Sequence, residues 1–123
     1  MKNKKTILIA DDDEGIVDAL TLMLGDEGYS VQVTYGTHTL SSVKKNKPDL
    51  ILLDLWMAGI NGQTICTQLK SNFATKHIPV IIISANKDIE SVATTCNADD
   101  YLSKPFEMND LLSKIGMSLT TSS

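Results

Sequence analysis

The chain has 123 residues, of which 42% are hydrophobic, so it can form one compact domain with an ordinary core and is short for two. Its formal net charge is −4 and its 11 basic residues are all lysine, which argues against nucleic-acid binding, because that function usually needs a basic face with arginine side chains. No apolar run approaches the roughly 20 residues of a membrane-spanning helix, so we expect no membrane partner.

The cellular compartment is indicated by the start of the chain and by its two cysteines. The start is basic, but the apolar segment that directly follows it, Ile7–Ala10, is too short for a signal peptide. Cys66 and Cys96 form no close-spaced motif and are expected to be free thiols in a reducing compartment. We therefore expect a cytoplasmic protein.

Five short apolar runs recur along the chain at steady intervals, and each predicts a β-strand. The runs are Ile7–Ala10, Tyr29–Thr34, Leu50–Leu53, Val80–Ile83 and Tyr101–Leu102. The third and fourth are almost continuously apolar, which is typical of strands covered on both faces in a parallel sheet.

The stretches between these runs carry apolar residues at helical spacing. The first is a stripe at Val17, Leu20 and Leu24 that ends before Gly28, and the second is the segment Thr39–Lys45, which ends in lysines. The third is a stripe at Ile65, Leu69 and Phe73, with Asn61 as the expected helix cap. The last two are a short face at Ile89, Val92 and Ala93 and a face at Met108, Leu111, Leu112 and Ile115. Five alternations of strand and helix predict an α/β three-layer sandwich around a five-stranded parallel sheet. We expect one domain over residues 1–120, a frayed end from Ser118, and residues 121–123 as a tail or the start of a linker.

Polar residues follow four of the five apolar runs. Asp11 and Asp12 follow the first run, Asp54 the third and Ser84 the fourth, while Lys104 follows the fifth after one residue. Because sites in parallel sheets form at the carboxyl ends of the strands, we expect these groups to converge on one edge.

Such a group favours phosphoryl chemistry assisted by a metal ion. Crowded carboxylates repel one another unless a cation lies among them, and Mg²⁺ prefers oxygen ligands of this kind, with Mn²⁺ as an alternative. A carboxylate beside the metal can attack phosphorus and form an aspartyl phosphate, while an ammonium and a hydroxyl stabilise the phosphoryl oxygens. Asp54, Lys104 and Ser84 fit these roles, and a cis bond between Lys104 and Pro105 would aim the lysine inward.

Four segments in this order resemble the receiver domains of two-component response regulators, including the chemotaxis regulators. They are ILIADDDEGI at 7–16, PDLILLDLWMAGINGQ at 48–63, IPVIIISA at 78–85 and ADDYLSKPF at 98–106. The resemblance implies a flavodoxin-like (βα)₅ topology with strand order 2-1-3-4-5. It also implies a signalling switch that catalyses only its own phosphotransfer and slow self-dephosphorylation, and is not an enzyme acting on other substrates.

The resemblance assigns a role to each residue of the expected site. Asp54 matches the phosphoacceptor, and Asp12, Asp54 and the backbone carbonyl of Trp56 match the direct metal ligands. Asp11 matches the acidic residue that acts through a metal-bound water, and Lys104 the lysine that pairs with the phosphoryl group.

Two further residues match the family's conformational switch. Ser84 matches the switch hydroxyl, and Tyr101 matches the aromatic residue whose ring turns inward on activation, although an aromatic residue also suits a strand end for structural reasons alone. The switch is expected to change the face formed by helix 4, strand 5 and helix 5. In the family this face pairs domains or contacts an effector, so we expect the phosphorylated form to bind an effector or to form a homodimer.

The resemblance also implies a docking face for a histidine kinase or a histidine phosphotransfer domain. It is expected at Gly15, Ile16 and Ala19 on the first helix, with Pro105 and Phe106 beside it. Burial of these residues under neighbouring loops is the alternative.

Trp56 and Asp13 receive separate interpretations. Trp56 stands two residues after the expected phosphoacceptor, where a bulky ring would hinder an attacking water and slow the loss of phosphate; it could also simply cover apolar loop surface. Asp13 matches no site of the family and is interpreted as a helix cap.

Two other functions compete with the receiver interpretation. The pair Asp11 and Asp13 after a strand also resembles the motif of haloacid-dehalogenase-type phosphatases, in which Asp11 would be phosphorylated and Asp13 would act as acid and base. A pseudo-receiver, which only binds partners, is the other alternative. It would be expected to lack one of the key groups, and none is missing.

Overall fold

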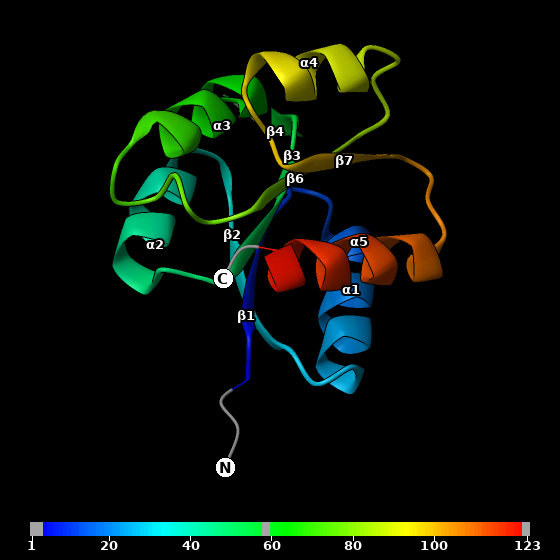
Figure 1. Cartoon of the computed structure of the whole chain (residues 1–123). Coiled ribbons are helices and arrows are strands. Elements are labelled where there is room, and N and C mark those ends of the chain that lie inside the picture. Colours follow the sequence, from blue (N-terminus) through cyan, green and yellow to red (C-terminus); the bar gives the residue numbers. More distant parts are fainter. Residues whose placement is uncertain (1–3, 58–59, 122–123) are drawn as a thin grey trace.

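The computed structural model describes residues 4–57 and 60–121. Five strands form its central sheet, and each coincides with one of the apolar runs. They are β1 (Thr6–Ala10), β2 (Ser30–Thr34), β3 (Leu50–Asp54), β6 (Val80–Ser84) and β7 (Asp100–Ser103). All neighbouring strands are parallel and follow the order β2-β1-β3-β6-β7 (Figure 1). Counted along the chain, this is the expected order 2-1-3-4-5, so the predicted topology is confirmed.

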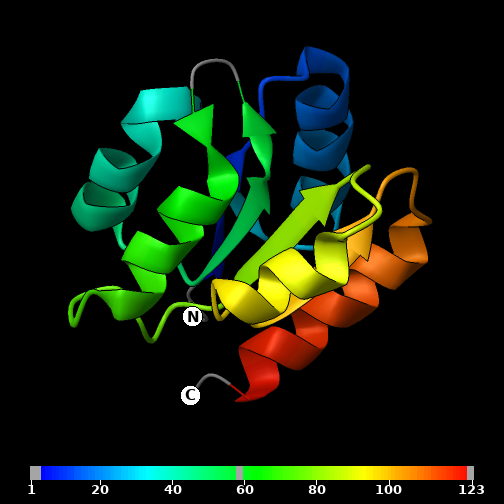
Figure 2. The same cartoon turned by 90° about the horizontal axis from the view of Figure 1, so that it is seen from above.

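Helices cover both faces of this sheet and give the protein three layers. The helices are α1 (Glu14–Asp26), α2 (Thr39–Asn46), α3 (Gly62–Ser71), α4 (Ile89–Thr95) and α5 (Met108–Thr121), with a short 3₁₀ turn η1 (Gly36–His38) before α2. Figure 2 shows α1 and α5 on one side of the sheet and α2, α3 and α4 on the other. Asp13 and Asn61 cap α1 and α3 as expected, since their side chains accept hydrogen bonds from the backbone N–H groups of Ile16 and Gln63.

Alternate residues of the central strands point to opposite faces and build two hydrophobic clusters. The α1–α5 core includes Ile7, Ile9, Leu50, Leu52, Val17, Leu20, Leu111 and Ile115, and the α3–α4 core includes Leu8, Ala10, Ile51, Leu53, Ile65, Leu69, Ile89 and Ala93. Burial of each large aliphatic side chain contributes about 1.5–3 kcal/mol. This two-sided burial explains why β3 and β6 are almost continuously apolar.

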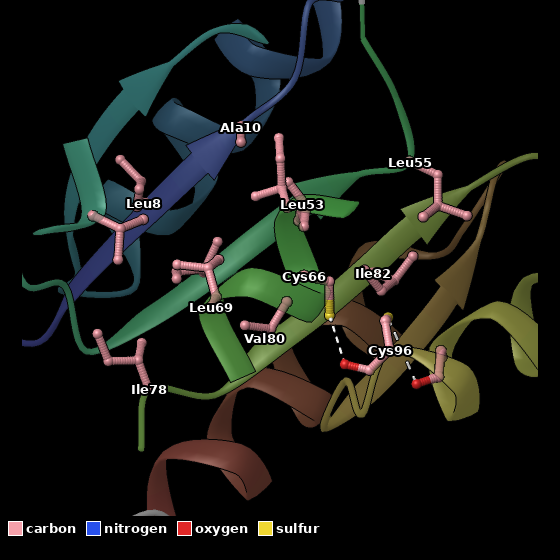
Figure 3. Packing of buried hydrophobic residues seen from close by; sticks show 14 of the residues in the cluster. Leu8, Ala10, Leu53, Leu55, Cys66, Leu69, Ile78, Val80, Ile82 and Cys96 are labelled. Atoms are coloured by element: carbon pink, nitrogen blue, oxygen red, sulfur yellow. Dashed lines mark hydrogen bonds between the residues drawn. The ribbon is translucent and has the colours of Figure 1, made fainter. Parts of the chain in front are cut away.

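Both cysteines belong to the α3–α4 core (Figure 3). They are free thiols, as expected, and the Sγ of Cys66 donates to the backbone carbonyl of Cys96 over 3.5 Å. Burial is the main cause that raises the pKa of the Cys66 thiol above its ordinary value. The two sulfur atoms therefore act as small hydrophobic groups that pack α3 against the end of α4.

Two expectations about helix ends are wrong. Phe73 was expected on the apolar stripe of the third helix, but α3 ends at Ser71 and 85% of Phe73 is exposed, with Lys76 over its ring. The end of the chain was expected to fray from Ser118, but α5 continues to Thr121; the rest of the expected tail, residues 122–123, lies outside the described residues.

A two-stranded antiparallel hairpin, β4 (Trp56–Met57) with β5 (Ile60–Asn61), lies between β3 and α3 and was not predicted. The backbone N–H of Gly62, the next residue, donates to the carbonyl of Leu55 over 2.7 Å. A Cβ atom at Gly62 would lie 2.5 Å from the backbone oxygen of Asp54. Only glycine allows α3 to start this close to the end of β3.

The described residues contain no helix that combines the length and the apolar character needed to cross a membrane.

Candidate functional site

The carboxyl ends of β1, β3, β6 and β7 meet at one edge of the sheet. Ala10 is level with Leu53, Asp54 with Ile83, and Ser84 with Ser103. Asp11 and Lys104 directly follow two of these aligned positions, so the parallel register brings the expected polar residues to the same edge.

Asp11, Asp54 and Lys104 form the centre of the candidate site. The Nζ of Lys104 lies 3.1 Å from Oδ2 of Asp11 and 3.7 Å from Oδ2 of Asp54. The side chains of Asp11, Asp54 and Lys104 are only 3%, 12% and 19% exposed. One largely buried ammonium thus faces two largely buried carboxylates, an arrangement that is stable only if the charges are well compensated.

The electrostatics of Asp54 reflect this shortage of positive charge. Burial raises the pKa of Asp54 above its usual value, and the nearby Asp11 carboxylate raises it further. Lys104 and the backbone N–H of Trp56 oppose the shift, since both favour the charged form of Asp54. A second cation at this place would favour ionisation of both carboxylates.

This donor set fits a hard divalent cation such as Mg²⁺. The described residues 4–57 and 60–121 contain no group of three His, Cys, Asp or Glu side chains that could hold a metal ion together. Mg²⁺ is usually bound by one or two carboxylates and keeps several waters, so Asp54 with Asp11 beside it, acting through a metal-bound water, fits such an ion. Asp12, the residue after Asp11, is half-buried, and its role as a direct ligand stays a prediction.

Asp11 is fixed on both of its oxygen atoms. Oδ2 accepts a hydrogen bond from Lys104, and Oδ1 accepts one from the backbone N–H of Asp13 over 2.9 Å. Asp13 itself caps α1, as described above, which gives it a structural explanation.

Ser84 and Lys104 are positioned by neighbouring strand ends. Ser84 is 1% exposed, and its hydroxyl accepts a hydrogen bond from the backbone N–H of Asn86 over 3.0 Å. The backbone N–H of Lys104 donates to the carbonyl of Ser84 over 2.8 Å, which ties the end of β7 to the end of β6. The expected cis bond between Lys104 and Pro105 is present.

Trp56 and Tyr101 differ in their surroundings. Trp56 is 61% exposed, and its backbone N–H lies 3.4 Å from Oδ1 of Asp54, so its backbone borders the site. Tyr101 is half-buried, packs against the α3–α4 core and is level with Ile82, two residues before Ser84.

The expected docking residues are only partly accessible. Gly15, Ala19 and Pro105 are exposed, whereas Ile16 and Phe106 are half-buried and pack against the α1–α5 core. Leu22 of α1 is 70% exposed, and it was missed although it also lies off the buried stripe of that helix. This omitted leucine extends the apolar exposed surface of α1.

Comparison with known families gives a match over most of the chain. Residues 7–116 match the response regulator receiver domain. The chain is 35% identical over 115 residues to the DNA-binding response regulator MtrA of Mycobacterium tuberculosis, covering 91% of this chain and 49% of that protein. It is 41% identical over 112 residues to the response regulator ArlR of Staphylococcus saprophyticus, and the match covers 89% of this chain and 50% of that protein. The chain therefore spans about half the length of these relatives.

Solved structures show the same similarity. A putative response regulator from Chloroflexus aurantiacus superposes with a TM-score of 0.89 at 33% identity, covering 96% of this chain and 99% of that one. A CheY-like receiver domain protein from Methanospirillum hungatei superposes with a TM-score of 0.88 at 27% identity, covering 98% of this chain and 97% of that one.

Proposed function

The chain belongs to the family of response regulator receiver domains, and on that basis we propose that it accepts a phosphoryl group on Asp54. The phosphoryl donor is the phosphohistidine of a histidine kinase or of a histidine phosphotransfer domain. The observation that carries this proposal is the pair of buried carboxylates, Asp11 and Asp54, that share the ammonium of Lys104 at the carboxyl edge of the sheet.

The proposed reaction is an in-line transfer between two side chains. An Oδ atom of Asp54 attacks phosphorus, the bond between phosphorus and the histidine nitrogen breaks, and the imidazole leaves with the electron pair. Mg²⁺, or Mn²⁺ in its place, would be held directly by Asp12, Asp54 and the carbonyl of Trp56, with Asp11 acting through a metal-bound water, and would supply positive charge for the phosphoryl oxygens. Lys104 neutralises a second oxygen, since its Nζ already lies 3.7 Å from the reacting carboxylate.

The phosphorylated site then changes the output face. In this proposal the hydroxyl of Ser84 binds a phosphoryl oxygen, and the ring of Tyr101 moves toward the space next to it. The surface of α4, β7 and α5 then contacts an effector, an output domain or a second phosphorylated copy. We place this cycle in the cytoplasm, and we propose residues 1–120 as the receiver domain and 121–123 as a tail or linker.

Mass mapping after incubation with Mg²⁺ and phosphoramidate, a small phosphodonor that needs no partner, tests the proposal. We expect one phosphoryl group on Asp54, none in Asp54→Asn, and wild-type labelling in the control Asp88→Asn, which changes an exposed aspartate outside the carboxylate pair. A label on Asp11 would support a phosphatase of the haloacid-dehalogenase type. No label, together with no response of Trp56 fluorescence to Mg²⁺ or BeF₃⁻, would support a passive interaction module.

A panel of purified histidine kinases then identifies the physiological donor by comparing the rates of phosphotransfer.

A further inference from the structure

Lys114 of α5 makes two contacts around the strand that carries Tyr101. Its Nζ lies 3.0 Å from Oδ1 of Asp100 and 5.7 Å from the centroid of the Tyr101 ring. The side chains of Lys114 and Asp100 are 32% and 30% exposed, so neither contact is fully screened by water. All three residues line an open cavity of about 490 Å³ between β7 and α5.

Asp100 connects the lysine to the backbone of the tyrosine. The same Oδ1 atom that receives Lys114 also accepts the backbone N–H of Tyr101 over 2.8 Å. Because β7 is an edge strand, no strand among the described residues pairs with this N–H on its outer side. Tyr101 is therefore held at its backbone by Asp100 and covered at its ring by Lys114.

We propose that Lys114 is a positioning residue of the switch, which stabilises the resting position of the Tyr101 ring. The inference rests on the proposed function, in which this ring moves toward Ser84 when Asp54 is phosphorylated. Such a movement takes the ring away from the ammonium group on α5, so the cation–π contact exists only in the resting state. Lys114 thus lowers the population of the activated state.

The strength of the cation–π contact determines how much Lys114 lowers the population of the activated state. A cation–π interaction at a partly exposed site changes an equilibrium about two- to five-fold. When the activated state is a minor population, the apparent affinity for a ligand that selects it is proportional to that population. Removal of the ammonium should therefore tighten binding of an activating ligand by about two- to five-fold.

Titration with BeF₃⁻ at saturating Mg²⁺, followed by the fluorescence of Trp56, the single tryptophan, measures this affinity. Lys114→Met keeps the apolar stem and removes the charge, and we expect its apparent dissociation constant to fall about two- to five-fold. Lys114→Arg keeps the cation and should restore the wild-type value. The matched control Lys76→Met removes the cation over the exposed Phe73 ring and should leave the value unchanged.

Two further measurements separate a switch role from a general structural role. In a Tyr101→Leu background, Lys114→Met should have no effect on BeF₃⁻ affinity, because the ring that the lysine covers is gone. The chain has three tyrosines, so NMR signals of their rings are readily distinguished. In the absence of BeF₃⁻, Lys114→Met should move the Tyr101 signals toward those of the BeF₃⁻-bound wild type.

An unchanged or weaker affinity of Lys114→Met overturns the inference and leaves the proposed function intact. An equal effect in the Tyr101→Leu background overturns it as well. If the wild type itself shows no response to Mg²⁺ and BeF₃⁻, the proposed function fails, and the switch role of Lys114 fails with it.

Discussion

Gly62→Ala should show how much one added methyl group at the junction of β3 and α3 lowers the stability of the protein. A Cβ atom at this position would lie 2.5 Å from the backbone oxygen of Asp54, 2.7 Å from Cα of Leu55 and 2.9 Å from the oxygen of Leu55. All three atoms belong to the backbone, so no side-chain rotation can relieve the overlap. Either α3 or the end of β3 has to move.

The cost follows from the extent of this overlap. Forcing an extra methyl group into a filled space costs typically 1–3 kcal/mol, and the short contacts to backbone place this site toward the upper end. Replacing glycine by alanine inside a helix raises the free energy of unfolding by up to about 1 kcal/mol. The gain is smaller at Gly62, because it is the first residue of α3. We expect the free energy of unfolding to fall by about 1–3 kcal/mol.

Urea denaturation at 25 °C measures the effect, which corresponds to a midpoint lower by roughly 1 M for a typical slope. Gly116→Ala is the matched control, because a Cβ atom there meets nothing within 4 Å and the residue lies inside α5. This control should raise the free energy of unfolding by about 0.5–1 kcal/mol. If Gly62→Ala proved as stable as Gly116→Ala, the steric reasoning would be refuted.

Three further predictions concern the site and the core. Burial raises the pKa of Asp54 above its ordinary value of 3.8, so a protonated Asp54 stabilises the native state relative to an ionised one. This stabilisation is fully present below pH 3.8 and is lost as the pH rises through the pKa of the folded protein. Urea titrations in chelator-treated buffer should therefore show Asp54→Asn to be more stable than wild type at neutral pH, and equal stability there would contradict this. Trp56→Asn should shorten the phosphoryl half-life measured after rapid quenching, whereas Trp56→Phe should not; an unchanged half-life in Trp56→Asn would exclude shielding by the ring. Cys66 and Cys96 should not react with Ellman's reagent until urea unfolds the protein, because both are fully buried; rapid reaction of the native protein would show that this core opens.

Hydrophobic patterning was sufficient to predict the main strands, whereas their order in the sheet came from the resemblance to receiver domains. Runs such as Val80–Ile83 are short, β-branched and continuously apolar, which leaves few alternatives to a buried parallel strand. The hairpin β4–β5 was missed because each of its strands has two residues, which is too short to show periodicity. Phe73 was misplaced for the opposite reason: it continues the spacing of α3, although the helix has already ended at Ser71.

The site was predicted as a set of residues but not as a set of distances. The sequence predicted repulsion within the group of carboxylates but not which pair of them lies closest. In the structure the carboxylate that most affects Asp54 is Asp11, and Lys104 lies between the two. Such pairing depends on strand register and on side-chain burial, which the spacing of residues does not contain. The contact of Lys114 with the Tyr101 ring could not be predicted for the same reason, since it joins a helix to the edge of the sheet.

The carboxylate of Asp11 joins two segments that are 93 residues apart in sequence. One oxygen holds the lysine at the end of β7, and the other holds the backbone just before α1. A phosphoryl group that draws Lys104 toward Asp54, and a partner that displaces the first turn of α1, would thus act on the same side chain. If the proposed phosphotransfer takes place, Asp11 therefore connects the phosphoryl site to the start of the helix on which the donor is expected to dock.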